Sequence, residues 1–154
     1  MSKIRETLET QLLKLGSILM IFSSMVRFFF GMMFCNFATL SLVMGSITKQ
    51  RARLFNVTSI LIFAGAALEM VVGIIGTLNC EEPSGAKRCI GWGIATLIWT
   101  TVCNFLQIYL GYGASYVAWI TGAGVPGLFL LGAILFCSYS KRRREALHAL
   151  YPNL

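Results

Sequence analysis

The stretch LFNVTSILIFAGAALEMVVGIIGTL, residues 54–78, contains a single charged residue, Glu69. A helix of about 20 apolar residues is long enough to cross the hydrocarbon of a bilayer. Only helices and closed barrels cross it, because every backbone polar group must be satisfied without water. This stretch therefore predicts a transmembrane helix.

Three further apolar stretches flank it, and they predict spans at about 17–46, 90–110 and 116–139. Hydrophobic residues make up 56% of the chain and charged residues 12%, against about 25% charged residues in soluble domains. The sequence therefore predicts an all-α, polytopic integral membrane protein. We expect a bundle of four transmembrane helices that forms a single membrane domain over residues 1–154.

The segments around the spans carry their own signals. Residues 3–14, KIRETLETQLLK, predict a short amphipathic helix at the membrane interface, with three leucines on one face: Leu8, Leu12 and Leu15. The run KQRAR at 49–53 predicts the first loop. In the fourth span, GAGVPG at 122–127 predicts a bend or local unwinding.

The chain is basic, with a net charge of +7. Its cations lie beside apolar runs, so anionic lipid headgroups are the expected partner and nucleic acid is not. The basic tail, residues 140–154, opens with four of them: Lys141, Arg142, Arg143 and Arg144. The alternative interpretation is that these charges only orient the helices.

Orientation follows from the excess of Lys and Arg in cytoplasmic segments. With four spans, the two termini and the 79–89 loop share one side and carry nine cations, against three on the other. Both termini are therefore predicted to be cytoplasmic. Cys80 and Cys89 bound that loop, and a disulfide between them would require an oxidising compartment and the inverted orientation.

Two ionisable residues, Arg27 and Glu69, fall inside predicted spans, where such residues indicate function by default. At 1.5 Å per residue they lie roughly 15 Å and 13 Å from the same membrane face. We therefore expect an intramembrane charge pair. It is interpreted as a staple that sets helix register or as part of an ion or proton pathway, and the remaining alternative is that Arg27 extends to the interface.

Small and polar residues recur at helical spacing within the spans. Gly31, Gly65 and Gly73 are expected to let helices approach closely. On the third span, residues about four positions apart share one helix face: Thr96, Thr100, Asn104 and Gln107. We interpret this stripe as interhelical packing, and the alternative is a narrow polar pore that includes Glu69.

Signatures of catalysis are missing from the sequence. Its one histidine, His148, lies in the tail, and no paired carboxylates occur within the spans. The spacing of Cys80 and Cys89 matches neither a redox motif nor a zinc site. We therefore expect no catalytic residue, no metal, no cofactor and no enzymatic activity.

Four spans, short termini and the loop NCEEPSGAKRC resemble the plan of small tetraspan membrane proteins of the MARVEL, claudin-like and CD20-like groups. The loop with its following span is similar to the last loop and span of CD20-like proteins, although here it joins the second and third spans. The resemblance implies a scaffolding, assembly or trafficking role and supplies no site residues.

We therefore expect a non-enzymatic tetraspan that acts as a structural or accessory subunit, or as an organiser, of a membrane complex. Its expected partners are other membrane protein subunits or further copies of itself, recognised through helix–helix contacts. The alternative function is a small oligomeric ion channel or transporter that uses Glu69 and the polar stripe.

Overall fold

A computed structural model describes residues 2–79, 85–109 and 116–150 of the chain. The described elements are all helical, and in chain order they are α1 (Ser2–Val43), α2 (Lys49–Asn79), α3 (Ala86–Tyr109), α4 (Tyr116–Trp119), the π-helical η1 (Ile120–Gly124) and α5 (Val125–Leu150). Because α4, η1 and α5 follow one another without a gap, they form one continuous span.

Four of the described helical segments are long and apolar enough to cross a membrane: Thr10–Val43, Lys49–Asn79, Ala86–Tyr109 and Tyr116–Arg142. The shortest has 24 residues, and about 20 suffice. The prediction of an all-α protein with four candidate spans is confirmed. The four spans indicate an integral, multi-pass membrane protein.

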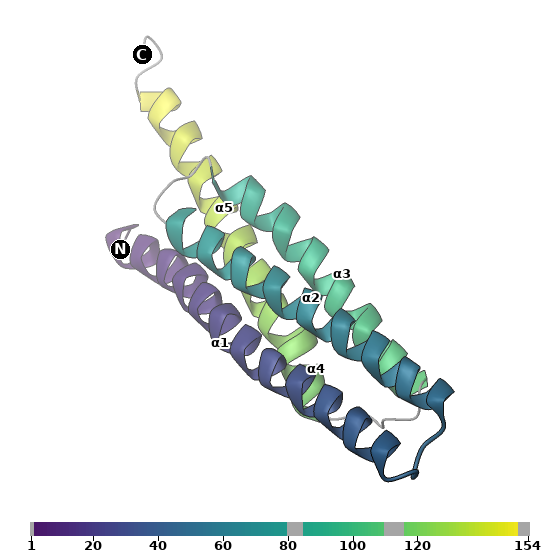
Figure 1. Ribbon diagram of the computed structural model, residues 1–154. Helices are drawn as coiled ribbons and strands as arrows, with labels where there is room; N and C mark the ends of the chain where they lie inside the picture. The colour runs from purple at the N-terminus through teal and green to yellow at the C-terminus, as the bar shows by residue number, and fades with distance from the viewer. Residues whose placement is uncertain (1, 80–84, 110–115, 151–154) are drawn as a thin grey trace.

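The spans lie side by side in a bundle (Figure 1). The helix α1 packs against α2 and α5, and α3 packs against the same two helices from the other side. The start of α1 and the end of α5 lie at the same end of the bundle (Figure 1). Side chains that point to the middle of this ring can therefore contact several spans.

The structure shows no separate short helix before the first span. Residues 3–14, predicted as an interfacial helix, form the first turns of α1. Of the residues nearby, Leu13 is fully buried, whereas Leu15 is 52% exposed. A Cβ on Gly132 would lie 3.0 Å from Leu13 Cα, so close packing on α5 holds this part of α1 as a continuous helix.

The predicted loop at 49–53 is also helical. The α1 helix ends at Val43, and Gly45 adopts a φ of +68°, the left-handed conformation typical of helix C-termini. Thr48 then accepts a hydrogen bond at its Oγ1 from the N–H of Arg51, at 3.4 Å. This N-terminal cap starts α2 at Lys49, so the connection between α1 and α2 is shorter than expected.

Close backbone approach holds α1 in place. A Cβ on Gly73 of α2 would lie 2.8 Å from the Ser17 carbonyl oxygen, and one on Gly16 would lie 2.9 Å from Phe129 Cα. Small residues at such contacts allow membrane helices to gain packing energy, because lipid provides no hydrophobic drive between them. The apolar core beside these contacts contains Leu13, Met20, Val72, Ala86, Cys89, Phe129, Ala133 and Phe136.

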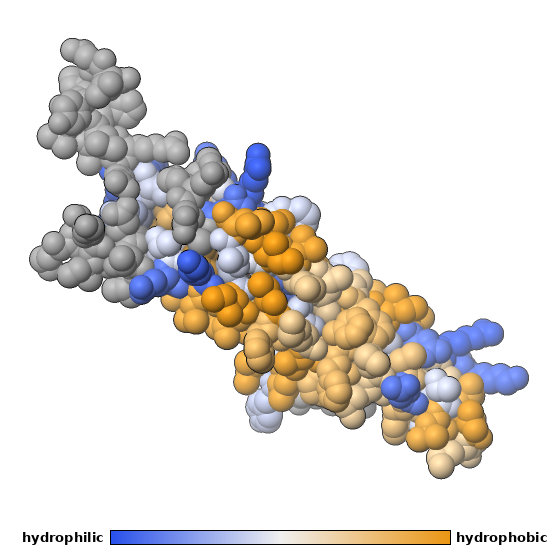
Figure 2. Space-filling model, turned by 60° about the vertical axis from the view of Figure 1, so that its left-hand side comes forward, coloured by the Kyte–Doolittle hydropathy of each residue, from blue (hydrophilic) through white to orange (hydrophobic). Residues whose placement is uncertain are grey.

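The outer surface is strongly apolar. Figure 2 shows hydrophobic residues over the middle of the bundle and hydrophilic side chains gathered toward its two ends. Many large apolar side chains are more than half exposed, among them Phe22, Phe29, Phe37, Ile60 and Val102. This distribution is typical of a surface that contacts lipid.

Candidate functional site

An ion pair between α1 and α2 occupies the interior of the bundle. Arg27 Nε lies 3.1 Å from Glu69 Oε1. Arg27 is 6% exposed and Glu69 is not exposed at all. A lone buried charge is far more costly than a buried pair. Each residue therefore lowers the free-energy cost of burying the other.

The second oxygen of Glu69 faces Ser23, which lies one helical turn before Arg27. Ser23 Oγ is 3.0 Å from Glu69 Oε2 and 3.1 Å from the main-chain oxygen of Thr121. One hydroxyl on α1 therefore contacts both α2 and η1. Ser23 was not among the predicted site residues, although its spacing from Arg27 puts both on one face of α1.

The guanidinium of Arg27 fits where two glycines leave room. A Cβ on Gly65 would lie 3.4 Å from Arg27 Nη1 and 3.2 Å from Trp99 Nε1. A Cβ on Gly122 would overlap Arg27 Nη2 and the amide nitrogen of Asn104. The Arg27 side chain thus lies among α2, α3 and η1. Gly122 was part of the run predicted to bend the fourth span but was not predicted as a site residue.

The irregularity in the fourth span is a π-helical turn. The N–H of Val125 bonds to Ile120 O, five residues back, and Pro126 has no N–H to donate. In an α-helix, the N–H of residue 125 would donate to the Thr121 carbonyl and that of residue 126 to the Gly122 carbonyl. Hydroxyls from other spans lie at those oxygens instead, with Ser23 at Thr121 and Thr100 at Gly122. The expected local unwinding therefore occurs at Ile120–Gly124.

The polar stripe of α3 faces this turn. Thr96, Thr100 and Asn104 are buried, and Gln107 is half-buried. Thr96 donates to the Trp92 carbonyl in its own helix at 2.8 Å. Asn104 Nδ2 donates to the Ala118 carbonyl of α4 at 3.0 Å, while its Oδ1 has no hydrogen-bond partner among the described residues.

The other predicted residues lie outside this polar centre. A Cβ on Gly31 would contact the Phe63 ring, and Gly73 lies against the α1 backbone. Cys89 is buried near the start of α3, while Cys80 lies outside the described residues. Within the described part of the chain, no three His, Cys, Asp or Glu side chains are grouped so as to hold a metal.

Residues 140–150 of the basic tail continue α5 as a helix. Lys141 and Arg142 are exposed, and Lys141 Nζ lies 3.9 Å from Glu145 Oε1, one turn ahead. The side chains of Arg143 and Arg144 lie outside the described part. An exposed ion pair of this kind adds little stability, so these cations are available to other anions.

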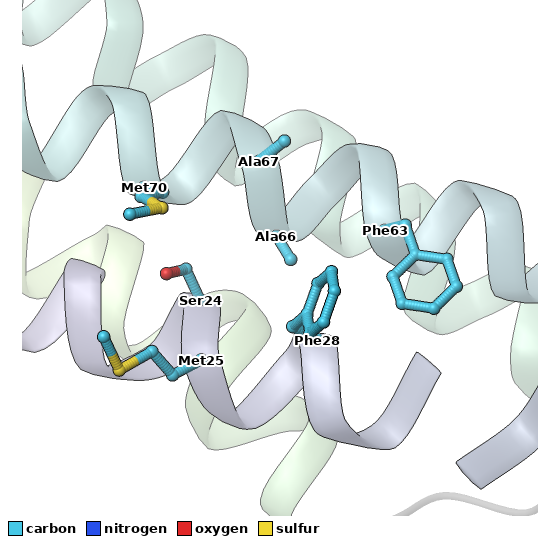
Figure 3. Close-up of a pocket in the computed structure, with 7 residues that line it drawn as sticks. All are labelled: Ser24, Met25, Phe28, Phe63, Ala66, Ala67 and Met70. Carbon is cyan, nitrogen blue, oxygen red and sulfur yellow. The ribbon is translucent and has the colours of Figure 1, made fainter. Parts of the chain in front are cut away.

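A pocket of about 320 Å³ opens between α1 and α2. Figure 3 shows it, with Phe28, Phe63 and two methionines around a floor that includes Ala66; its full lining is Ser24, Met25, Phe28, Phe63, Ala66, Ala67 and Met70. Ser24 is the one polar residue in this lining, and its hydroxyl donates to the Ile21 carbonyl of its own helix at 2.6 Å. The pocket is therefore suited to an apolar group.

The fold and the site define a class: a membrane protein with four candidate spans, a buried polar centre and an apolar exterior. No protein-family model, curated protein or solved structure matches the chain.

Proposed function

We propose that the protein is a non-enzymatic tetraspan that works by association, as a structural or accessory subunit or as an organiser of a membrane complex. The observation that carries the proposal is the division between interior and surface. The polar groups of the spans contact one another inside the bundle, whereas the exterior offers apolar helix faces. Recognition by such a molecule takes place between helices.

The pocket between α1 and α2 is a feature of this exterior that suits a partner helix. Its floor includes the small side chain of Ala66, the exposed Ala67 also lines it, and the aromatic rings of Phe28 and Phe63 form its sides. Small residues allow close approach of a second helix, and packing supplies the association energy in lipid. A single apolar side chain of a partner helix fits into a space of this kind.

Filling the pocket tests the proposal. Ala67 is exposed and lines the pocket, so Ala67→Leu occupies the space without entering the bundle. Ala64 is also exposed on α2 but does not line it, so Ala64→Leu is a matched control. After extraction in mild detergent, native mass spectrometry should show a stoichiometric membrane subunit or a homo-oligomer for the wild type and Ala64→Leu. The complex should be reduced severalfold for Ala67→Leu.

Two results would contradict this function. The wild-type protein could remain a monomer bound only to lipid in every mild detergent and in bilayer nanodiscs. Alternatively, Ala64→Leu and Ala67→Leu could weaken the complex equally, which would place the contact elsewhere on the surface.

A second candidate function is a small oligomeric ion channel or transporter. The observation that favours it is Asn104, a buried residue whose Oδ1 lacks a partner among the described residues, close to Arg27 and Gly122. Ions and protons pass through membranes along such polar groups. Flux through liposomes that contain only the purified protein, abolished by Glu69→Gln and retained in Ser24→Ala, would support it. Absence of flux from the wild type would exclude it.

A further inference from the structure

The Ser23 hydroxyl lies between two acceptors that it cannot serve together. Its oxygen is 3.0 Å from Glu69 Oε2 and 3.1 Å from the Thr121 carbonyl oxygen. A serine hydroxyl carries one hydrogen and two lone pairs. When Glu69 is ionised, both neighbours of Ser23 are pure acceptors, and one of them is left without a donor.

The Thr121 carbonyl depends on Ser23 because of the π-helical turn. The N–H of Val125, its usual helical donor, bonds to Ile120 O, and Pro126 has no N–H. The hydroxyl of Thr121 itself points back to the Val117 carbonyl at 2.8 Å. Ser23 is thus the side-chain donor from a neighbouring span that reaches this oxygen.

We propose that Glu69 is a reversible proton-binding site and that its occupancy decides which acceptor Ser23 serves. Ionised Glu69 is the stronger acceptor, because hydrogen bonds to charged groups are about twice as strong as neutral ones. Ser23 then donates to the carboxylate, and the Thr121 carbonyl loses its donor. When one proton from water adds to Oε2, the new O–H donates to Ser23 Oγ, and the Ser23 hydrogen turns to Thr121.

The surroundings of Glu69 leave Arg27 as its main charged neighbour. Arg27 lies on α1, and the titratable side chain of α3 near the pair is Cys103. Residues 117–136 of the fourth span contain no titratable side chain. Arg27 also lies against Gly65 and Gly122, so its position does not depend on Glu69 alone.

The proposed proton site couples three elements. In the protonated state a hydrogen-bonded chain runs from Glu69 on α2, through Ser23 on α1, to Thr121 in η1. In the ionised state this chain ends at Ser23, and η1 loses its tie to α1. Protonation therefore fastens the irregular part of the fourth span to the first span, whatever complex the protein belongs to.

The chain offers a specific probe of the Thr121 carbonyl. Thr121–Gly122 is the one Thr–Gly peptide bond in the sequence. Labelling with carbonyl-¹³C threonine and ¹⁵N glycine therefore isolates this carbonyl in a nitrogen–carbon correlated solid-state NMR spectrum of the protein in bilayers. Infrared spectra of the same sample report the protonated carboxyl of Glu69, and Glu69→Gln identifies the band.

We expect the Thr121 carbonyl resonance to shift with pH in parallel with the Glu69 carboxyl band. In Glu69→Gln, whose amide donates to Ser23 at any pH, the resonance should stay at its low-pH position. In Ser23→Ala it should not follow pH, while the carboxyl band still does. Ser24→Ala is the matched control and should behave like the wild type, because among the described residues the Ser24 hydroxyl donates to the Ile21 carbonyl of its own helix.

Either of two results would overturn the proposal. One is the absence of a protonated Glu69 band across the whole pH range in which the wild type stays folded. The other is a Thr121 resonance that ignores the titration of Glu69, or that still follows pH in Glu69→Gln. The pH dependence of the Thr121 resonance is read on the wild-type protein, so the proposal stays testable even where a variant folds poorly.

Discussion

The hydroxyl of Thr100 on α3 contacts the main-chain oxygen of Gly122, the oxygen that an α-helix would pair with residue 126, and it also lies 2.9 Å from the Thr96 carbonyl oxygen of its own helix. Residue 126 is a proline, which has no N–H. A proline is tolerated in a membrane span when a neighbouring helix satisfies the carbonyl that it leaves open. The Thr100 hydroxyl therefore ties the irregular turn of the fourth span to the third.

Replacing Thr100 by Val should destabilise the bundle by about 1–2 kcal/mol, because the Gly122 carbonyl is left without its donor. Thr96→Val is the matched control, since Thr96 is equally buried and, among the described residues, its hydroxyl donates to the Trp92 carbonyl of its own helix rather than to another span. The free energy of unfolding is measured in mixed micelles with increasing denaturing detergent. Equal losses for the two variants would show that the contact to Gly122 adds no stability.

Arg27 and Glu69 should be energetically coupled. Arg27→Leu alone leaves a buried carboxylate, and Glu69→Leu alone leaves a buried guanidinium, so each should cost about 3–5 kcal/mol. The double variant should cost less than the sum of the two, by about 1–3 kcal/mol. A double-mutant cycle on the free energy of unfolding measures the difference. Simple additivity would mean that the 3.1 Å contact contributes nothing.

Gly122 and Gly124 should respond in opposite ways to alanine. A Cβ on Gly122 would overlap Arg27 Nη2 and the amide of Asn104, whereas one on Gly124 meets nothing within 4 Å. Gly122→Ala should therefore lower stability by about 1–3 kcal/mol, as overpacking does. Gly124→Ala should be neutral or stabilising by up to about 1 kcal/mol. Thermal unfolding in detergent compares them, and tolerance of both would refute the close packing at Gly122.

The orientation of the bundle remains a prediction from charge. The start of α1 and the end of α5 lie at the same end (Figure 1), so a single tag decides the orientation of both. We expect a C-terminal tag to be inaccessible to an impermeant reagent in intact cells and accessible after permeabilisation, because nine cations lie on that side against three. Labelling of intact cells would establish the inverted orientation.

The basic tail should hold anionic lipid by charge alone. Changing all four cations from Lys141 to Arg144 to Gln should weaken retention of anionic lipid, by about 1 kcal/mol for each charge near the surface. Native mass spectrometry in defined lipid mixtures measures the bound lipid. The difference should shrink at high salt, because exposed charges are screened. A loss that does not depend on salt would indicate a specific receptor for the tail.

The spans themselves could be predicted from the sequence, because hydropathy is a property of each segment by itself. The stretch at 54–78 is apolar whatever it packs against, and the shared depth of Arg27 and Glu69 follows from counting residues along straight helices. The irregularity around Pro126 could be predicted for the same reason, because a proline lacks an N–H whatever surrounds it. The predictions of a separate helix at 3–14 and of a loop at 49–53 were wrong, because packing against Gly132 and a cap at Thr48 decided the helix boundaries there.

The cross-span contacts were decided only by the tertiary structure. Ser23 and Thr121 are 98 residues apart, and whether they meet depends on the rotation and axial offset of two helices. Hydropathy does not encode either quantity. In lipid, an apolar helix face is about equally stable against another helix or against an acyl chain. Rotation and offset are set by where backbones approach at Gly16, Gly73 and Gly132. Those contacts bring a serine, a glutamate and an open carbonyl together inside the bundle.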